Sequence, residues 1–246
     1  MRTIKLTIAY DGTDFLGWQR QAGQARTVQA VLESALEKMH GHPVALAGAG
    51  RTDSGVHARA QAASFQTDIE SIKPDRFVPA LNSLLPPDLR ITDSREAASD
   101  FHARFSARMR TYRYFFTANR QALPHESRYA LQLWRQPRIG VLNSYCRLLP
   151  GERDCAIFAG SGDTSKSTYR NITHAVFLVE GGQLIFEISA NAFLLRMVRS
   201  VAGTFLHYEE SGTPPAQLKD IIAGGDRSQA GPTLPPQGLF LWKVEY

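Results

Sequence analysis

Hydrophobic and polar residues alternate at the start of the chain. Over residues 3–10 (TIKLTIAY) every second side chain is apolar, which predicts a half-buried strand that ends in a turn at Asp11. Over residues 27–39 the apolar side chains instead recur three and four positions apart, which predicts an amphipathic helix. Thr27 is placed to cap the start of this helix, and Gly41 is placed to end it.

The same two periodicities continue to the end of the chain. They predict strands within residues 44–48, 60–67, 88–97, 173–180, 183–190 and 238–246. Helices are predicted at 74–86, where prolines interrupt the pattern, and at about 191–209 and 215–223. Gly181 and Gly182 join two of the strands as a hairpin. Hairpin strands mixed with helices favour an α+β fold with mixed, mainly antiparallel sheets over a doubly wound parallel sheet.

The character of the chain changes near residue 105. Residues 1–105 are predicted to form an N-terminal half that carries a glycine-rich loop. Residues 106–150 are predicted to hold a central basic and aromatic strand followed by an irregular connection with several prolines. Residues 151–246 are predicted to form a C-terminal half.

Composition restricts the class of protein. With 246 residues and 43% hydrophobic content the chain is long enough for one large domain or two halves with a proper core. No run of eighteen apolar residues occurs, so no membrane-spanning helix is expected. Lys5, Thr7 and Asp11 interrupt the first apolar stretch, which is atypical of a signal peptide. We therefore expect a cytoplasmic protein.

The two cysteines give no sign of a metal site or a disulfide framework. Cys146 and Cys155 lie in no C-x-x-C motif and have no histidines at the spacing of zinc ligands. We interpret both as small buried residues. The chain also has no motif for a cofactor, so neither a metal nor a cofactor is expected.

The charge of the chain suits an anionic partner. The net charge is +5, and arginine, which binds phosphate through two donors and stacks on bases, far outnumbers lysine. Five arginines and six aromatic residues interleave over residues 101–120, which hold no acidic residue. This stretch is typical of a surface that contacts phosphates.

The glycine-rich turn at residues 47–58 (AGAGRTDSGVHA) is the first candidate for chemistry. Gly48, Gly50 and Gly55 free the backbone for tight or left-handed conformations, and Arg51 and Asp53 place a cation and a carboxylate two residues apart. Ionised carboxylates act as nucleophiles or bases. From these residues alone, a turn in which the aspartate only caps the next element is the favoured interpretation.

Five separated motifs together resemble one family. Residues 50–58 (GRTDSGVHA) are similar to the signature of the TruA family of tRNA pseudouridine synthases, which act on the anticodon arm. The other similar segments, in the order of the family, are residues 10–21 (YDGTDFLGWQRQ), 100–107 (DFHARFSA) with 112–114 (YRY), 191–199 (NAFLLRMVR) and 238–239 (GL). Residues 121–170 match poorly, which leaves their contacts with a substrate undefined.

The resemblance implies a role for four residues. Asp53 matches the catalytic aspartate of the family, and Arg51 matches the neighbouring arginine that helps to hold the target base outside the stack. Tyr112 matches the tyrosine that stacks on the target uracil, and Arg199 matches the arginine that pairs with the aspartate. From the residues alone, Tyr112 is as well explained as part of a sheet core and Arg199 as a solvated helix charge. His57 and His102 lie in the motifs, but no role is assigned to them.

The resemblance also implies a fold, a reaction and a partner. The expected fold is the pseudouridine synthase fold, with two similar halves around a central basic cleft, usually in a homodimer. The expected enzyme is an isomerase that converts uridine to pseudouridine at positions 38, 39 and 40 of the tRNA anticodon stem and loop. Two alternatives remain open at this stage: a pseudouridine synthase for another RNA site, and a non-catalytic RNA-binding module.

Overall fold

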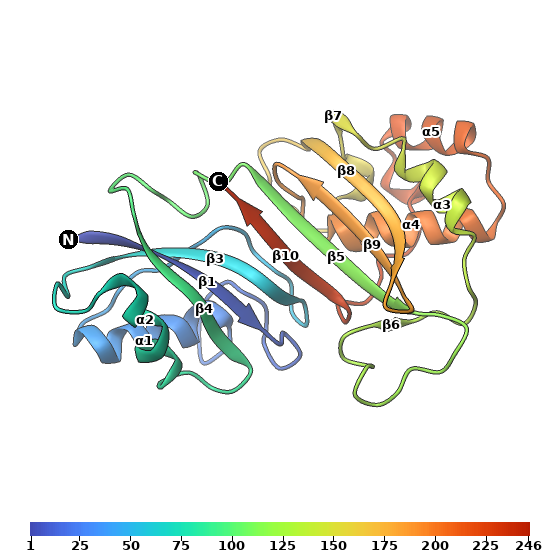
Figure 1. The fold of residues 1–246 in the computed structure, drawn as a ribbon. Helices are drawn as coiled ribbons and strands as arrows, with labels where there is room; N and C mark the ends of the chain where they lie inside the picture. The colour runs from blue at the N-terminus through green and yellow to red at the C-terminus, as the bar shows by residue number, and fades with distance from the viewer. The chain divides into compact units, whose positions relative to one another are not determined.

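The computed structural model describes residues 1–246 and contains two compact units (Figure 1). The first unit comprises Met1–Arg108 and Phe240–Tyr246, and the second comprises Met109–Leu239. The last residues of the chain thus join the N-terminal unit, whereas the sequence analysis grouped them with residues 151–246. A pairing between the two ends of a chain leaves no local periodicity by which it could be predicted.

The first unit is built on a four-stranded sheet with the order β4-β1-β3-β10. The strands are β1 (Arg2–Tyr10), β3 (His57–Thr67), β4 (Leu89–Ala97) and β10 (Leu239–Glu245), and the short β2 (Ala47–Gly48) also pairs with β3. β1 is antiparallel to both neighbours, and β10 is parallel to β3. The helices α1 (Val28–His40) and α2 (Phe77–Asn82), with the 3-10 turn η1 (Pro74–Arg76), lie on the same face of this sheet (Figure 1).

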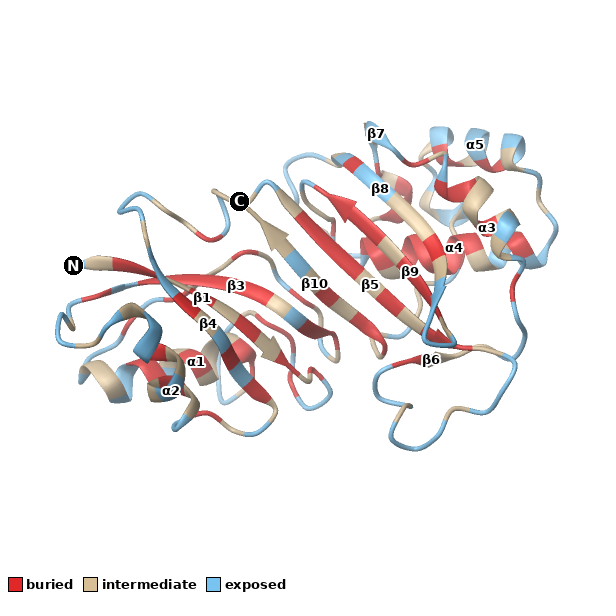
Figure 2. Cartoon of the chain, in the orientation of Figure 1, coloured by how far each residue is buried: buried red, intermediate tan, exposed pale blue.

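The predicted patterns of β1 and α1 are confirmed. Ile4, Leu6 and Ile8 are fully buried, and Figure 2 shows the buried positions along β1 and β3. The Thr27 hydroxyl accepts a hydrogen bond from the Ala30 amide at 3.3 Å, which caps the first turn of α1. Gly41 ends the helix with a left-handed φ of 75°.

The second unit is built on a four-stranded antiparallel sheet with the order β5-β9-β8-β7. Its strands are β5 (Met109–Thr117), β7 (Gly151–Asp154), β8 (Tyr169–Glu180) and β9 (Gln183–Ala190), and β6 (Leu131–Gln132) pairs in parallel with β5. The other elements are α3 (Ile139–Cys146), η2 (Ala156–Phe158), α4 (Met197–Glu210), α5 (Pro215–Gly224) and η3 (Arg227–Gln229). Gly181 and Gly182, both with positive φ, form the predicted hairpin between β8 and β9.

The α+β class with mainly antiparallel pairing is therefore confirmed, but the short strands β6 and β7 were not predicted, and three predicted segments differ from the structure. β2 is only two residues long, and α3 falls in residues 121–150, which were predicted to be irregular. The third difference is α4, which begins at Met197 instead of about residue 191, because Arg196 has a φ of 58° and cannot continue a right-handed helix. None of the helices has the length and the apolar composition needed to span a membrane.

Candidate functional site

Asp53 lies on the loop between β2 and β3, residues 49–56, which we call the Asp53 loop. Thr52 and Val56 are buried, so they anchor the loop. Asp53 is half-buried, and Arg51 is exposed. Buried side chains thus anchor the loop, while the side chains of Arg51 and Asp53 are fully or partly accessible to solvent.

A second segment, residues 11–18, holds the main chain of the Asp53 loop, and we call it the clasp segment. Its Trp18 amide donates to the carbonyl of Thr52 at 3.0 Å. Its Phe15 carbonyl accepts from the Gly55 amide at 3.3 Å and from the Ser54 hydroxyl at 3.2 Å. The backbone on both sides of Asp53 is therefore fixed by a strand-end segment that is distant in sequence.

Glycines make this close approach possible. Gly17 has a φ of 84°, and a Cβ there would lie 2.7 Å from the Thr52 carbonyl oxygen. A Cβ on Gly48 would overlap the Trp18 ring. Gly55 has the positive φ that the sequence predicted, whereas Gly50 has neither a positive φ nor a close neighbour.

Buried hydrogen bonds support the loop from below. The Tyr10 hydroxyl and the Thr52 hydroxyl lie 2.8 Å apart, and the side-chain amide of Gln61 donates to the Gly50 carbonyl at 2.9 Å. Burial raises the pKa of Tyr10, and its hydrogen bonds with Thr52 and Gln61 only partly oppose that effect. Tyr10 therefore stays neutral and serves as a structural partner of Thr52.

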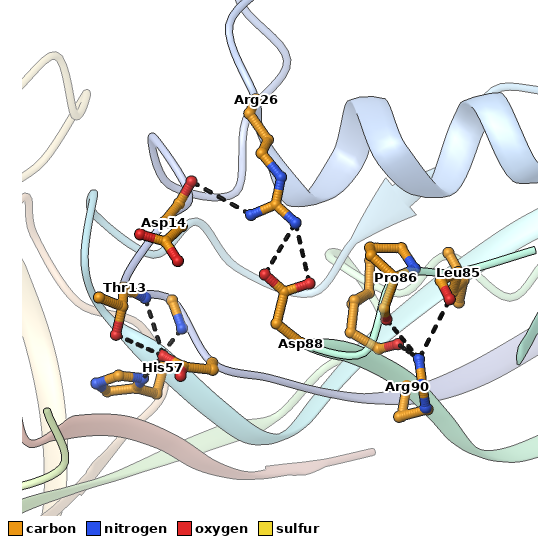
Figure 3. A network of polar contacts seen from close by, with 11 residues as sticks. Thr13, Asp14, Arg26, His57, Leu85, Pro86, Asp88 and Arg90 are labelled. Atoms are coloured by element: carbon orange, nitrogen blue, oxygen red, sulfur yellow. Dashed lines mark hydrogen bonds and ion pairs between the residues drawn. The ribbon is translucent and has the colours of Figure 1, made fainter. Parts of the chain in front are cut away.

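His57, which lies near the end of the family-like motif, has a structural position. Its side chain is fully buried and stacks on Phe240 at 4.6 Å. Its Nδ1 accepts from the Gly12 amide at 3.0 Å and lies 3.1 Å from the Asp11 carboxylate (Figure 3). Asp11 in turn accepts from the amide and the hydroxyl of Thr13. His57 thus joins the start of β3 to the clasp segment.

Arg26 holds the other side of the clasp segment (Figure 3). Its guanidinium donates to both carboxylate oxygens of Asp88 at 2.9 and 2.8 Å and to the Asp14 carbonyl at 3.3 Å. It also lies 4.0 Å above the Phe15 ring. An ion pair in which one guanidinium nitrogen contacts both carboxylate oxygens, combined with a cation–π contact, fixes the position of this segment relative to β4.

Tyr112 lies on β5 in the second unit. Tyr112, Tyr114 and Phe116 lie at alternate positions of this strand, and all three are buried. Only 8% of Tyr112 is exposed, and its ring meets the edge of Phe193 at 5.1 Å. Phe193 precedes α4 and was predicted to lie inside that helix, so the contact arises from a turn that the periodicity did not reveal.

Arg199 lies in the first turns of α4 and is half-buried. Its Nε donates to the Leu234 carbonyl at 2.6 Å. The neighbouring Pro235 carbonyl accepts a hydrogen bond from the Tyr114 hydroxyl. Burial raises the pKa of Tyr114, and the charge of Arg199 opposes that rise. Arg199 therefore helps to fasten the segment that leads into β10, a role that its helix position alone did not predict.

The expected phosphate-contacting surface over residues 104–120 does not hold as a whole. Arg110 is buried and donates to the Asn191 carbonyl at 2.6 Å. Arg113 pairs with Glu187 at 2.6 Å and Arg120 pairs with Glu126 at 2.6 Å. The partners of Arg110 and Arg113 lie far away in the sequence, and that of Arg120 lies six residues further on, so these arginines stabilise the fold. Arg104, Arg108 and Arg120 are exposed, and of these Arg120 is paired with Glu126.

Both cysteines are buried and not joined in a disulfide, as predicted. Burial raises the pKa of Cys146 to about 12 and that of Cys155 to about 11, which keeps both thiols protonated.

Each unit thus carries two of the four predicted site residues, Arg51 and Asp53 in the first and Tyr112 and Arg199 in the second. Sequence reasoning missed the supporting residues Tyr10 and Trp18 as parts of this site. The only signal for them was their place in the motif at residues 10–21, which contains the clasp segment.

Comparison with known proteins gives consistent matches along the chain. A family model for tRNA pseudouridine synthase matches residues 6–106 and 145–246. The tRNA pseudouridine synthase A of Treponema denticola is 50% identical over 249 residues, which cover 100% of this chain and 93% of that protein. The protein of the same name from Treponema pallidum strain Nichols is 48% identical, covering 94% of this chain and 84% of its own. That of Caldicellulosiruptor bescii is 41% identical over 100% of both chains.

Proposed function

Because this chain belongs to the tRNA pseudouridine synthase family and is an isomerase acting on uridine in tRNA, we propose that its targets lie in the anticodon stem and loop, at positions 38, 39 and 40. Asp53 is the proposed catalytic carboxylate. The reaction detaches uracil from C1′ of the ribose, turns it and rejoins it through C5. Since it involves neither a redox change nor a net hydrolysis, the proposed reaction uses no cofactor and no metal.

The observation that supports Asp53 most is how it is held. The Thr52 carbonyl before Asp53 accepts a hydrogen bond from the clasp segment, and the Gly55 amide after Asp53 donates one to that segment. The Asp53 side chain itself is half-buried. Catalytic groups act best when the protein fixes their position before the substrate arrives. A carboxylate in this position can serve as a nucleophile toward the ribose or the base, or as the base that removes a proton from the sugar.

The other three residues are proposed to bind the target nucleotide. Tyr112 is proposed to stack on the extruded uracil, and such stacking contributes about 1–3 kcal/mol per base. Exposed Arg51 is proposed to hold the base outside the helical stack. Arg199 is proposed to pair with Asp53 and to orient it.

Mapping of pseudouridine by chemical labelling tests this proposal. Unmodified tRNA is incubated with the protein and with the variants Asp53→Asn and Asp53→Ala. We expect modification in the anticodon arm that both substitutions abolish, with tRNA affinity kept within about threefold, because a single contact contributes little to a large polar interface. Asp75→Asn is the matched control, since Asp75 lies on the same unit and its side chain is 71% exposed.

The outcomes separate the alternatives. Undiminished activity in Asp53→Asn would remove Asp53 from the mechanism. Labelling confined to another position or another RNA would support the first alternative, an enzyme for a different site, with residues 121–170 as the source of the altered specificity. If the protein without substitutions binds tRNA but forms no pseudouridine, the second alternative, an RNA-binding module, would be supported.

We also propose that the chain acts as a homodimer in the cytoplasm, as the family resemblance implies. In a dimer, both subunits would contact the same tRNA. Light scattering coupled to size exclusion measures the mass directly, and we expect about twice the 27.3 kDa of a single chain. A mass of one chain at micromolar concentration would contradict the dimer without affecting the proposed reaction.

A further inference from the structure

The turn at residues 102–106, which we call the Phe105 turn, is firmly anchored to the first unit. Ala103 is fully buried. Its amide donates to the Ser64 hydroxyl on β3 at 3.0 Å, and its carbonyl accepts from the Tyr246 hydroxyl at 3.0 Å. The turn is therefore attached both to the central strand of the sheet and to the end of the chain.

His102 gives the turn its internal shape. Its Nδ1 accepts from the amides of Arg104 at 3.1 Å and Phe105 at 3.4 Å. Its carbonyl accepts from the Ser106 amide at 2.9 Å, and its own amide donates to the Ser106 hydroxyl at 3.1 Å. Four hydrogen bonds within five residues leave this backbone with little freedom to lose when a ligand binds.

This rigid turn presents an aromatic ring to the solvent. Phe105 is 78% exposed, although burial of a phenylalanine is favourable. The His102 ring lies 4.4 Å from the Phe105 ring at an angle of 31°, so it supports one side of the phenyl group. The Arg104 guanidinium lies 5.7 Å from the same ring.

The surroundings of the ring favour a nucleic acid as its partner. Arg104 and Arg108 are both exposed, and no acidic residue occurs between them or in the strand that follows, although the exposed Asp100 precedes the turn. A flat ring beside cations is the arrangement with which proteins hold unpaired bases and their phosphates. An apolar protein partner would not explain why the flanking residues are cationic.

We propose that Phe105 is a stacking platform for an unpaired base of the tRNA substrate, distinct from the target uridine, and that Arg104 contacts an adjoining phosphate. The inference rests on tRNA as the substrate, but it depends neither on Asp53 nor on which positions are modified. It adds a contact to RNA that lies outside the four proposed site residues.

Equilibrium binding of unmodified tRNA tests the platform. We expect Phe105→Leu, which keeps the apolar volume but removes the flat ring, to weaken the affinity by about 5- to 150-fold, and Phe105→Trp to retain it within about twofold. Arg104→Gln should weaken binding and reduce the slope of log Kd against log salt by about one, whereas Phe105→Leu should leave that slope unchanged.

Tyr169→Leu is the matched control. Tyr169 is 57% exposed and also stands beside an arginine, Arg170, whose guanidinium donates to the carbonyls of Ser167 and Tyr169. We expect this variant to bind tRNA like the unmodified protein. An equal loss in Tyr169→Leu and Phe105→Leu, or full affinity in Phe105→Leu, would overturn the platform. Thermal unfolding of each variant excludes a loss of fold as the cause.

Failure of the platform and failure of the proposed function can be distinguished. The binding series is repeated in the Asp53→Asn background, in which turnover is not required for the readout. If that variant stays active, the proposed role of Asp53 fails while the binding result for Phe105 stands. If tRNA affinity is insensitive to Phe105 while Asp53→Asn is inactive, only the platform fails.

Discussion

At the scale of single residues, Gly17 connects the backbone of the clasp segment to the Asp53 loop. Gly17 has a φ of 84°, and Gly23, six positions later, has a φ of 81° with open space where a side chain would begin. Both positions resist a side chain because of their backbone, at a cost of about 1–2 kcal/mol. Only Gly17 also lies against the Thr52 carbonyl.

We therefore expect Gly17→Ala and Gly23→Ala to lose similar stability from backbone strain, with a further loss of about 1–3 kcal/mol in Gly17→Ala from the forced shift of the loop. Only Gly17→Ala should lower kcat, by at least about tenfold, because a small displacement of a catalytic group is costly. Thermal unfolding and single-turnover rates measure the two effects. Equal rates in the two variants would show that the clasp segment does not position Asp53.

Arg199 has both a structural contact, with the Leu234 carbonyl, and a proposed catalytic contact, with Asp53. Arg227 offers a matched comparison, because it too holds the segment before β10, donating to Thr233 at 3.0 Å and to the Ala159 carbonyl at 3.1 Å. We expect Arg199→Ala to lower the single-turnover rate by about 100-fold or more, the usual effect of losing one electrostatic partner, and Arg227→Ala by less than about fivefold.

Affinity completes the comparison of the two arginines. Arg199→Ala should alter the Kd for tRNA less than it alters the rate. A collapse of binding with intact single-turnover chemistry would make Arg199 an RNA contact instead of a partner of Asp53. Similar rate losses in both variants would assign its effect to the segment at residues 231–236 alone.

The residues of the site were only partly predictable from the sequence. Asp53 and Gly55 carry local signals, a carboxylate on a turn and a glycine where φ is positive. The support of the loop carries none, because the Tyr10 hydroxyl reaches Thr52 across 42 positions of sequence. The same holds for the Leu234 carbonyl that accepts from Arg199, since any residue type supplies a carbonyl.

At the scale of elements, periodicity predicted β1 and α1, because each buries one face along its length, and the two glycines at residues 181–182 predicted the hairpin of β8 and β9. The predictions of α3 and of the start of α4 failed for local reasons. α3 has only eight residues, too few for the helical period to stand out. The segment before α4 contains apolar residues at helical spacing, but the left-handed Arg196 separates it from the helix.

The irregular connection after β5 is fixed by one buried carboxylate near the end of α4. Glu209 is fully buried and accepts from the Arg135 guanidinium, and from both the amide and the Nε of Arg138, the latter two at 3.1 and 2.7 Å. We expect Glu209→Gln to lower the free energy of unfolding by about 1.5–3 kcal/mol, the range for hydrogen bonds to charged groups.

Glu210→Gln is the control for this prediction. Glu210 is the next residue, its side chain is 72% exposed, and it lies 3.8 Å from the Arg135 Nε. An exposed pair of this kind contributes little, so the loss should stay below about 0.5 kcal/mol. Urea unfolding at neutral pH measures both variants, and equal values would mean that Glu209 does not anchor the connection.

The contribution of Glu209 should depend on pH in one direction. Burial raises the pKa of Glu209, but the hydrogen bonds from Arg135 and Arg138 lower it by a larger amount. The resulting pKa therefore lies below the ordinary value of 4.5. A lowered pKa in the folded state means that the stabilisation is complete above the ordinary value and is lost as the pH falls through the lowered one. The difference in unfolding free energy between the unmodified protein and Glu209→Gln should therefore be constant from pH 7 to about pH 5 and shrink at lower pH. A difference that grows on acidification would contradict the sign.

At the scale of the whole molecule, the two units differ in how the chain builds them. The second unit is continuous, whereas the first needs Phe240–Tyr246 from the far end of the sequence. These last residues stack Phe240 on His57, place Tyr246 3.8 Å beneath the Lys5 ammonium and supply the hydroxyl that holds Ala103. Both the start of β3 after the Asp53 loop and the Phe105 turn therefore depend on the end of the chain.

This topology predicts an uneven response to truncation. Removing Phe240–Tyr246 should accelerate hydrogen exchange in β1 and β3 by at least about tenfold and abolish pseudouridine formation, while β8 and β9 keep most of their protection because their pairing lies within Met109–Leu239. Peptide-resolved exchange by mass spectrometry measures this directly. Lys243→Ala, a 61% exposed position on β10, should leave both units protected and controls for a change in that strand's surface. Equal acceleration in both units would mean that they unfold as one cooperative body, and unchanged exchange in β3 would mean that its hydrogen bonds with β1 and β2 suffice to hold the Asp53 loop without the end of the chain.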